Sequence, residues 1–424
     1  MMVSIVNQPL DSLLPPYQNS IALWTYHVAP HIAKSFNTSI YGRKHDHRRI
    51  WIGQNNVEYR FMPRILPNRV LFERNGNLFQ RLGRSDLPYY ASRLYYLDYI
   101  TRVAWELRRR KVDVVHIHNF TQFVPVVRAI HPKAKIALHM HCEWLNQLDY
   151  EVIKERIAQC DLVLGSSDYI TDKVKERYPE FSSRCDVLYN GVDVELFHPG
   201  SGNHSKSADG PRLLFVGRIS PEKGVHTLIE AFACLANQFP AAQLDLAGPV
   251  ASLPLEYIVG ISEEPEIAAL ARFYEEDYGI ILRRLVAENG LADRVNFLGV
   301  LSQEELVDYY QAADILINPS YSESFGMSLV EAMATETPVV ATRVGGMVNI
   351  VDENETGLLV DRGDVQGLAE AMKRLLGDDA LRQQMGKIGR QRVIDRFSWP
   401  EIAASAVEKY TNVVENGGRK TQNG

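Results

Sequence analysis

Residues 314–334 read DILINPSYSESFGMSLVEAMA, in which a short apolar strand runs into a polar loop and then into a helical pattern that begins near Met327. The first backbone N–H groups of such a helix have no partner inside it, and the helix dipole makes this end positive, so the loop suits an anion. Two glutamates flank that position, Glu323 in the loop and Glu331 about one turn into the helix. Carboxylates accept hydrogen bonds from neighbouring hydroxyls, so we predict a ligand that combines phosphate with polyol rings.

A second segment, residues 213–232 (LLFVGRISPEKGVHTLIEAF), repeats the order of strand, loop and helix. Its loop holds Arg218 and Lys223, followed by Gly224. Arginine offers a planar fork of donors and lysine a mobile point charge, a combination that suits a pyrophosphate. Each of these side chains taken alone is equally typical of a solvated turn or helix face. The two segments together predict a site for a sugar nucleotide.

The rest of the chain alternates short apolar strands with amphipathic helices, which is typical of parallel sheets covered by helices on both faces. We therefore expect an α/β fold with two facing doubly wound units, residues 1–197 and 212–396. Residues 198–211 between them are rich in Gly, Ser and Pro and have the composition of a linker. Ligands of such sheets bind at the carboxyl ends of the strands, so the two units are expected to form one cleft.

Composition favours a cytoplasmic enzyme: the 424 residues are 46% hydrophobic and 23% charged. No apolar run approaches the roughly 18 residues that span a membrane, and the start MMVSIVNQPLD does not resemble a secretory signal. The cysteines at 142, 160, 185 and 234 are scattered, so we expect reduced thiols rather than disulfides or a zinc site. No Gly-x-Gly-x-x-Gly follows a strand, which disfavours a nicotinamide dehydrogenase.

Charge is distributed unevenly between the two halves. Residues 1–197 carry 26 Lys and Arg against 20 Asp and Glu, whereas residues 198–424 carry 20 against 32. The basic runs at residues 43–49 and 108–111 could meet an anionic membrane or a phosphorylated acceptor. Residues 108–111 could equally close the C-terminus of a helix, where basic side chains are favourable. No nucleic-acid partner is expected.

Histidines are the chemical candidates of the first half. His116 and His118 end one strand pattern, VDVVHIH, and His139 and His141 end the next, IALHMH. Reactive groups of doubly wound folds lie at strand ends, although a core imidazole is as common a role for each ring. The i, i+2 spacing lacks a carboxylate motif, and the one comparable string elsewhere, residues 193–195 (DVE), lies in a turn pattern. No metal and no cofactor are expected.

At the two loops the chain resembles the retaining glycosyltransferases of family 4 in the GT-B superfamily. The resemblance rests on Gly217-Arg218, Lys223-Gly224 and the pair Glu323 and Glu331, in this order. It implies that Arg218 and Lys223 bind the donor diphosphate, that Glu323 contacts the transferred sugar and that Glu331 binds the ribose. By the same resemblance, the backbone amides of Phe325, Gly326 and Met327 hold the sugar and phosphate, and Glu323, His141, Arg218 and Lys223 form the catalytic set.

Further expectations come from the same resemblance. His141 matches a histidine that touches the donor sugar, and His118 and Asn190 match cleft-lining positions. Residues 397–415 are expected to form a helix that returns to the first domain, followed by a flexible tail at residues 416–424. The chain departs from the family in two places. It has PPYQNS at residues 15–20 in place of a Gly-Gly pair, which puts donor contacts from this loop in doubt, and it carries a long acidic insertion at residues 249–294 whose role the sequence leaves open.

These observations predict a metal-independent, retaining transfer of a sugar from a nucleoside diphosphate, with a UDP-sugar favoured over GDP-mannose, to a hydroxyl acceptor. The sequence does not identify the acceptor or the oligomeric state. Two alternatives stay open: a sugar-nucleotide epimerase or hydrolase of the same fold, and a protein that binds sugar nucleotides without catalysis. Transfer by double displacement through a carboxylate nucleophile is a further mechanistic alternative.

Overall fold

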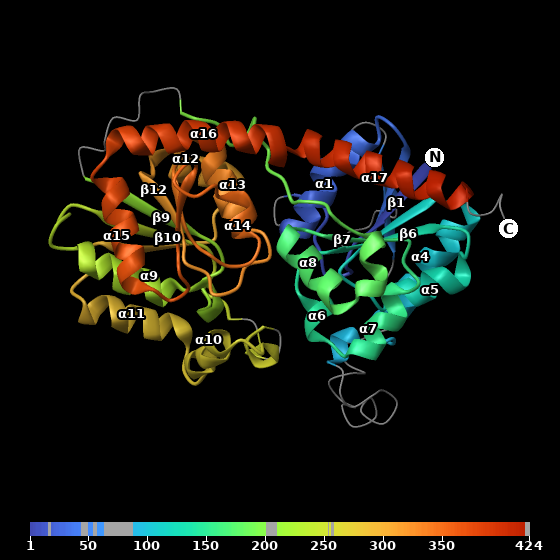
Figure 1. Cartoon of the computed structure of the whole chain (residues 1–424), viewed down its shortest axis with the longest axis horizontal. Helices are drawn as coiled ribbons and strands as arrows, with labels where there is room; N and C mark the ends of the chain where they lie inside the picture. Colours follow the sequence, from blue (N-terminus) through green and yellow to red (C-terminus); the bar gives the residue numbers. More distant parts are fainter. Residues whose placement is uncertain are drawn as a thin grey trace. The chain divides into compact units, whose positions relative to one another are not determined.

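The computed structural model describes residues 1–15, 18–43, 50–53, 57–62, 88–200, 210–252, 254–255 and 258–419. The chain divides into two compact units (Figure 1). The first comprises Met1–Asn190 together with Trp399–Gly424, and the second comprises Gly191–Ser398. Each unit is an α/β domain with its own sheet and its own apolar core, as the strand and helix pattern predicts.

The described residues of the first unit form an eight-stranded sheet in the order β3-β4-β2-β1-β5-β6-β7-β8. Neighbouring strands are parallel except at one edge, where β3 pairs with β4 in the antiparallel sense. The strands are β1 Met2–Val6, β2 Asn37–Arg43, β3 Ile50–Ile52, β4 Glu58–Met62, β5 Val114–His118, β6 Lys135–Met140, β7 Leu162–Gly165 and β8 Cys185–Val187. The helices of this unit are α1 Ser20–Ile32, α4 Leu97–Arg109, α5 Phe123–Ile130, α6 Trp144–Gln147, α7 Tyr150–Ile157, α8 Asp168–Arg177 and α17 Trp399–Arg419, with the 3₁₀ turns η2 Tyr89–Ala91 and η3 Pro179–Arg184.

The second unit has a six-stranded parallel sheet among its described residues, in the order β11-β10-β9-β12-β13-β14. Its strands are β9 Arg212–Val216, β10 Gln243–Ala247, β11 Val295–Gly299, β12 Ile315–Asn318, β13 Val339–Thr342 and β14 Gly357–Val360. Its helices are α9 Val225–Leu235, α10 Pro265–Ala268, α11 Tyr278–Glu288, α12 Gln303–Ala312, α13 Met327–Ala334, α14 Met347–Ile350, α15 Val365–Leu376 and α16 Asp379–Phe397, with the 3₁₀ turns η4 Pro221–Lys223, η6 Val259–Ile261 and η7 Ala269–Tyr274.

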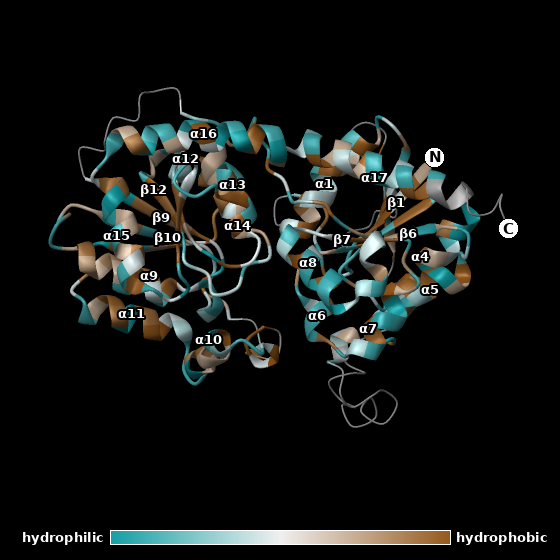
Figure 2. Cartoon of the chain, viewed as in Figure 1, coloured by the Kyte–Doolittle hydropathy of each residue, from teal (hydrophilic) through white to brown (hydrophobic). Residues whose placement is uncertain are grey.

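The central strands of both sheets are buried on both faces, and in the second sheet this explains the apolar runs of β9, β12 and β13. Leu213, Leu214 and Phe215 of β9 are all at most 1% exposed. Figure 2 shows the same pattern, with apolar strands inside each unit and more polar faces on the helices around them. Among the described residues, no helix is both long and apolar enough to span a membrane.

The boundaries between the units differ from the predicted limits of 197 and 397. Residues 191–197 belong to the second unit, because Val192 pairs with Ser398 and the Phe197 ring lies 5.8 Å from that of Tyr310. The last long helix begins at Trp399 rather than at Phe397, which ends α16.

The C-terminal helix α17 packs on α1 in the first unit. The ring of Trp399 stacks on that of His27 at 5.4 Å, and Tyr410 is buried in the same core as Trp24. The helix continues to Arg419, so its described part extends into the predicted tail. Residues 201–209 of the predicted linker and residues 420–424 of the tail lie outside the described residues.

The loop before α1 and the basic run at residues 108–111 each lie at the end of a helix. Asn19 caps α1, because its side chain accepts a hydrogen bond of 2.9 Å from the Ala22 N–H. Arg108 and Arg109 lie in the last turn of α4, beside the exposed Trp105. Membrane contact of this helix stays a prediction, and residues 16–17 and 44–49 lie outside the described residues.

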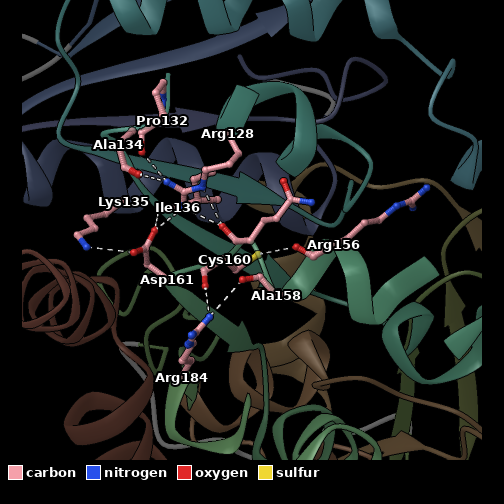
Figure 3. A network of polar contacts seen from close by, with 11 residues as sticks. Arg128, Pro132, Ala134, Lys135, Ile136, Arg156, Ala158, Cys160, Asp161 and Arg184 are labelled. Carbon is pink, nitrogen blue, oxygen red and sulfur yellow. Dashed lines mark hydrogen bonds and ion pairs between the residues drawn. The ribbon is translucent and has the colours of Figure 1, made fainter. Parts of the chain in front are cut away.

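A polar network joins α5 to the amino ends of β6 and β7 (Figure 3). The guanidinium of Arg128 donates to the carbonyls of Pro132, Ala134 and Gln159 and forms an ion pair of 2.6 Å with Asp161. Asp161 also accepts from Lys135 at 3.1 Å and from the Ile136 N–H at 3.0 Å. This arginine therefore satisfies backbone carbonyls that helix and strand ends leave without partners.

Candidate functional site

The two predicted loops of the second unit lie side by side at the point where the strand order reverses. The β9 and β12 strands are neighbours in the sheet, and their connections lead to opposite edges. Ligands of doubly wound folds bind at such a switch point, outside the carboxyl ends of the strands. The loops touch at Gly224, which has a φ of +68° and whose Cβ, if present, would lie 2.0 Å from the carbonyl oxygen of Pro319. A glycine is required there for both reasons.

The loop after β9 holds Arg218 in a network that the sequence did not reveal. The Arg218 guanidinium forms an ion pair of 2.6 Å with Glu222, and Ser220 donates to the same carboxylate oxygen at 2.7 Å. Glu222 is fully buried, whereas about a third of the Arg218 side chain, 29%, reaches the surface. The backbone carbonyl of Glu222 accepts from the Tyr321 N–H at 2.8 Å, which ties this loop to the other. Glu222 thus positions Arg218 and leaves part of its guanidinium accessible.

Lys223 and Glu323, which are far apart in the sequence, form an ion pair of 2.7 Å between the two loops. Both side chains are 18% exposed, so the pair is partly shielded from water. Burial raises the pKa of Glu323, but the charge and hydrogen bond of Lys223, the Phe325 N–H and the charge of Arg218 outweigh it and hold that pKa below its ordinary value. Glu323 is consequently a carboxylate at neutral pH and competes with any anionic ligand for Lys223.

Helix α13 begins directly after this loop and carries Glu331. Its N-cap, Gly326, has a φ of +114° and offers no side chain to the first amides of the helix. Glu331 is 7% exposed, and the Tyr310 hydroxyl donates to it at 2.6 Å. Burial raises the pKa of Glu331 to about 7, and the bond from Tyr310 opposes that shift. Tyr310 is a second residue that the sequence did not identify.

In the first unit, the four histidines at the ends of β5 and β6 form one cluster of rings. The rings of His118 and His141 are 5.0 Å apart, and those of His139 and His141 are 4.1 Å apart. His116, His118 and His139 are fully buried. Burial lowers the pKa of His116 and of His141 to about 3 and holds those of His118 and His139 well below the ordinary value. The cluster is therefore neutral at physiological pH.

Hydrogen bonds fix which nitrogens carry protons. The Leu188 carbonyl can only accept, so His139 donates to it through Nε2 at 2.9 Å. Thr25 donates its hydroxyl proton to Asn7 and therefore accepts from Nε2 of His118. Nδ1 of His118 is left with a lone pair, which accepts from Nε2 of His141 at 2.9 Å. The Asn190 side chain partly opposes the lowering of the His141 pKa, so the structure brings the predicted residues His118, His141 and Asn190 together.

Three of these histidines could supply metal ligands by distance alone. One nitrogen from each of His116, His118 and His139 lies within 4.8 Å of the others. Both nitrogens of His118 are already engaged, with Thr25 and with His141, so an ion would have to displace one of those bonds. The geometry of the rings therefore fits a cluster of packed, neutral histidines better than a metal-binding site. Asp193, the first residue of the string DVE at residues 193–195, caps its own turn by accepting from the N–H groups of Glu195 and Leu196.

Two family descriptions match this chain. Residues 201–392 match Glycosyl transferases group 1, and residues 65–196 match Glycosyltransferase Family 4. A D-inositol 3-phosphate glycosyltransferase of Nocardioides sp. is 31% identical over 319 residues, which cover 70% of this chain and 67% of that protein. One from Corynebacterium urealyticum is 34% identical over 265 residues, which cover 61% of this chain but only 58% of the relative.

Solved structures show the same fold at low identity. A sucrose-phosphate synthase from Thermosynechococcus elongatus has a TM-score of 0.70 and 23% identity, with 98% of this chain and 100% of that chain covered. The HepE protein of Anabaena in complex with UDP has a TM-score of 0.71 and 18% identity, with 97% and 100% covered. The chain therefore belongs to glycosyltransferase family 4 and is a glycosyltransferase of the GT-B fold.

Proposed function

We propose that this enzyme transfers a sugar from a nucleoside diphosphate donor to a hydroxyl acceptor, with retention of configuration and without a metal ion. The observation that carries the proposal lies in the second unit. Two cations, Arg218 and Lys223, lie on one loop at the switch point, and two carboxylates, Glu323 and Glu331, lie on the adjoining loop and helix. Cations beside free helix amides suit a diphosphate, and carboxylates suit sugar hydroxyls.

The ion pair between Lys223 and Glu323 suggests how donor binding prepares the site. A diphosphate that reaches Lys223 competes with Glu323 for the ammonium group, because both are anionic. Glu323 is then released to accept hydrogen bonds from the transferred sugar, whose ring becomes positively charged as the diphosphate departs. Arg218, Lys223 and the amides of α13 stabilise the departing phosphate, which is where negative charge develops. The contact between His141 and the donor sugar stays a prediction from the family resemblance.

A UDP-sugar is the donor that we favour, and a phosphorylated polyol is the acceptor to try first. Support for the donor comes from the HepE structures of the same fold, which are described as complexes with UDP and with UDP-glucose. Support for the acceptor comes from the relatives named D-inositol 3-phosphate glycosyltransferases. The excess of Lys and Arg over Asp and Glu in residues 1–197 is consistent with an anionic acceptor.

A donor screen tests the proposal. The enzyme is incubated with UDP-glucose, UDP-N-acetylglucosamine, GDP-mannose or ADP-glucose, each with and without inositol 3-phosphate, in EDTA, and products are identified by mass spectrometry. We expect glycosylated acceptor from a UDP-sugar in EDTA, with the donor's anomeric configuration by NMR. Sugar release that does not depend on acceptor would indicate a hydrolase, and binding without turnover across a wider acceptor panel would indicate a binding protein. Activity that appears only after magnesium or manganese is added would refute metal independence.

A further inference from the structure

The insertion at residues 249–294 lies between β10 and β11 and folds into short helical segments. Its described part contains η6, α10, η7 and α11. Figure 1 shows α10 and α11 on the side of the second unit where α9 also lies, and α11 packs against α9. The start of α9 follows the loop that carries Arg218 and Lys223. The insertion is therefore placed beside the candidate donor site of its own unit.

Apolar contacts and one ion pair fix the insertion to the loops of that site. Val259, Ile267 and Leu270 form a small buried cluster, against which Tyr321 of the loop after β12 packs. Glu264 of the insertion forms an ion pair of 2.6 Å with Arg362, which follows β14. The insertion is thus held by residues of the sheet's carboxyl edge.

His226, in the first turn of α9, provides a third anchor. Its ring stacks on Tyr321 at 5.5 Å and lies 4.3 Å from Phe273 of the insertion. The Tyr278 hydroxyl bonds to Nδ1 of His226 at 2.8 Å and accepts from the His226 backbone N–H at 3.2 Å. Aromatic stacking and a hydroxyl with two bonds fix the position of η7, which ends four residues before Tyr278.

The last residue of η7, Tyr274, lies beside the proposed diphosphate-binding loop. Segment η7 contacts η4, which contains Glu222 and Lys223. Burial raises the pKa of Tyr274 to about 12, with Glu222 raising it further and Arg218 lowering it, so the hydroxyl lies within electrostatic reach of both side chains. Within the described part of the chain, no hydrogen bond to this hydroxyl is formed. An unengaged O–H donor therefore accompanies Arg218.

We infer that Tyr274 is a further donor-binding residue, whose hydroxyl donates a hydrogen bond to the diphosphate beside Arg218. The inference rests on the proposed function, because it assumes that a nucleoside diphosphate occupies the switch point. It gives the insertion a definite role: the insertion carries a phosphate contact into the site on a segment that His226, Tyr321 and Arg362 hold in place. A hydroxyl beside a guanidinium adds a directed contact that the charge alone does not supply.

Calorimetric titration of the full-length enzyme with UDP and with uridine tests this role. Tyr274→Phe removes only the hydroxyl and should weaken UDP binding about three- to tenfold, the usual range for one hydrogen bond, while uridine affinity is unchanged. Tyr309→Phe is the matched control, because Tyr309 lies on α12 in the same unit and is partly buried. It should bind both ligands like the wild type. Arg218→Ala serves as the reference for a lost diphosphate contact.

The outcomes separate this inference from the proposed function. If Arg218→Ala weakens UDP binding and Tyr274→Phe does not, the inference is wrong and the donor site stands. Equal weakening of UDP and uridine by Tyr274→Phe, or a matching fall in melting temperature, would show a structural role and would also overturn it. If the wild type binds no UDP, the proposed UDP donor fails, and the inference fails with it.

Discussion

The carboxyl edges of the two sheets use polar side chains in opposite ways. At the end of β5 and β6, four histidines are packed against one another and against Trp24, and burial keeps them neutral. Beside β9 and β12, Arg218, Lys223 and Glu323 form ion pairs and are partly accessible, and only Glu222, the partner of Arg218, is fully buried among these four residues. The difference shows that the same fold position can be filled by a neutral core or by charges available to a ligand. Burial decides which, because a charge is kept only where a partner or water compensates it.

Two arginines show the same distinction. Arg128 is bonded to three backbone carbonyls and to Asp161, so most of its donors are used within the fold (Figure 3). Arg218 is held through Nε by Ser220 and through one terminal nitrogen by Glu222. Among the described residues, no acceptor bonds to its other terminal nitrogen, and 29% of the side chain is exposed. Arg128 therefore stabilises the fold, whereas Arg218 is held in position and keeps one terminal nitrogen available to donate hydrogen bonds to a ligand.

The largest expected effect is acid destabilisation of the first unit. The pKa values of His116 and His141 are about 3 in the folded chain and about 6.5 in an ordinary context, so the unfolded chain binds protons that the folded chain does not. Stability present above pH 6.5 is therefore lost as the pH falls toward 3, by up to about 1.4 kcal/mol per pH unit for each buried histidine. Asp11, whose pKa burial raises to about 6, acts in the opposite sense, but it is one group against four histidines.

Urea unfolding at pH 7.5 and pH 4.5, followed by tryptophan fluorescence, measures this effect. All five tryptophans, at positions 24, 51, 105, 144 and 399, belong to the first unit, so the signal reports that unit. We expect a clearly lower urea midpoint at pH 4.5. The same midpoint at both pH values would mean that the histidine cluster does not stay neutral in the folded chain.

The next effect concerns the charged edge. Lys223→Ala removes a proposed diphosphate contact and leaves Glu323 without its ion-pair partner, so kcat/KM for the donor should fall by about ten- to a hundredfold. Lys135→Ala is the matched control, because Lys135 also pairs with a carboxylate, Asp161, but in the structural network of the first unit. It should leave kcat/KM unchanged. Equal losses in the two variants would contradict the assignment of Lys223 to the donor site.

The smallest effect compares two tyrosine hydroxyls. Tyr410→Phe removes a 2.7 Å bond to His116, so it should lower the free energy of unfolding by about 1 kcal/mol and leave UDP affinity unchanged. Tyr310→Phe removes the bond to Glu331 at the other edge, so it should weaken UDP binding and raise the pH at which binding is half-maximal. Urea unfolding and calorimetry across pH 6 to 8 distinguish the two. Weaker UDP binding by Tyr410→Phe, or unchanged UDP binding by Tyr310→Phe, would contradict the assignment of the two hydroxyls to the core and to the donor site.

The sequence was sufficient for the features that depend on local pattern. The order of strand, loop and helix predicted both loops, and the structure places them side by side. The donor-binding chemistry that the residue types of Arg218, Lys223, Glu323 and Glu331 indicate stays a prediction. The sequence could not identify Glu222 or Tyr310, because their roles depend on burial and on partners that only the folded chain brings near. The unit boundary after Asn190 was missed for a similar reason: the pairing of Val192 with Ser398 joins segments far apart in the chain. The place of the insertion follows from contacts that the sequence does not reveal, with Tyr321, His226 and Arg362.

The most direct test of the central claim is the affinity for UDP, measured by calorimetry, of the wild type, Glu331→Gln and Glu323→Gln. If Glu331 binds the ribose, its replacement should weaken UDP binding by about 1.5 to 3 kcal/mol through lost charge-assisted hydrogen bonds. Glu323 should act on the sugar and competes with phosphate for Lys223, so Glu323→Gln should bind UDP at least as tightly as the wild type while turnover falls. Equal losses of UDP affinity in the two variants, or none in either, would contradict the account.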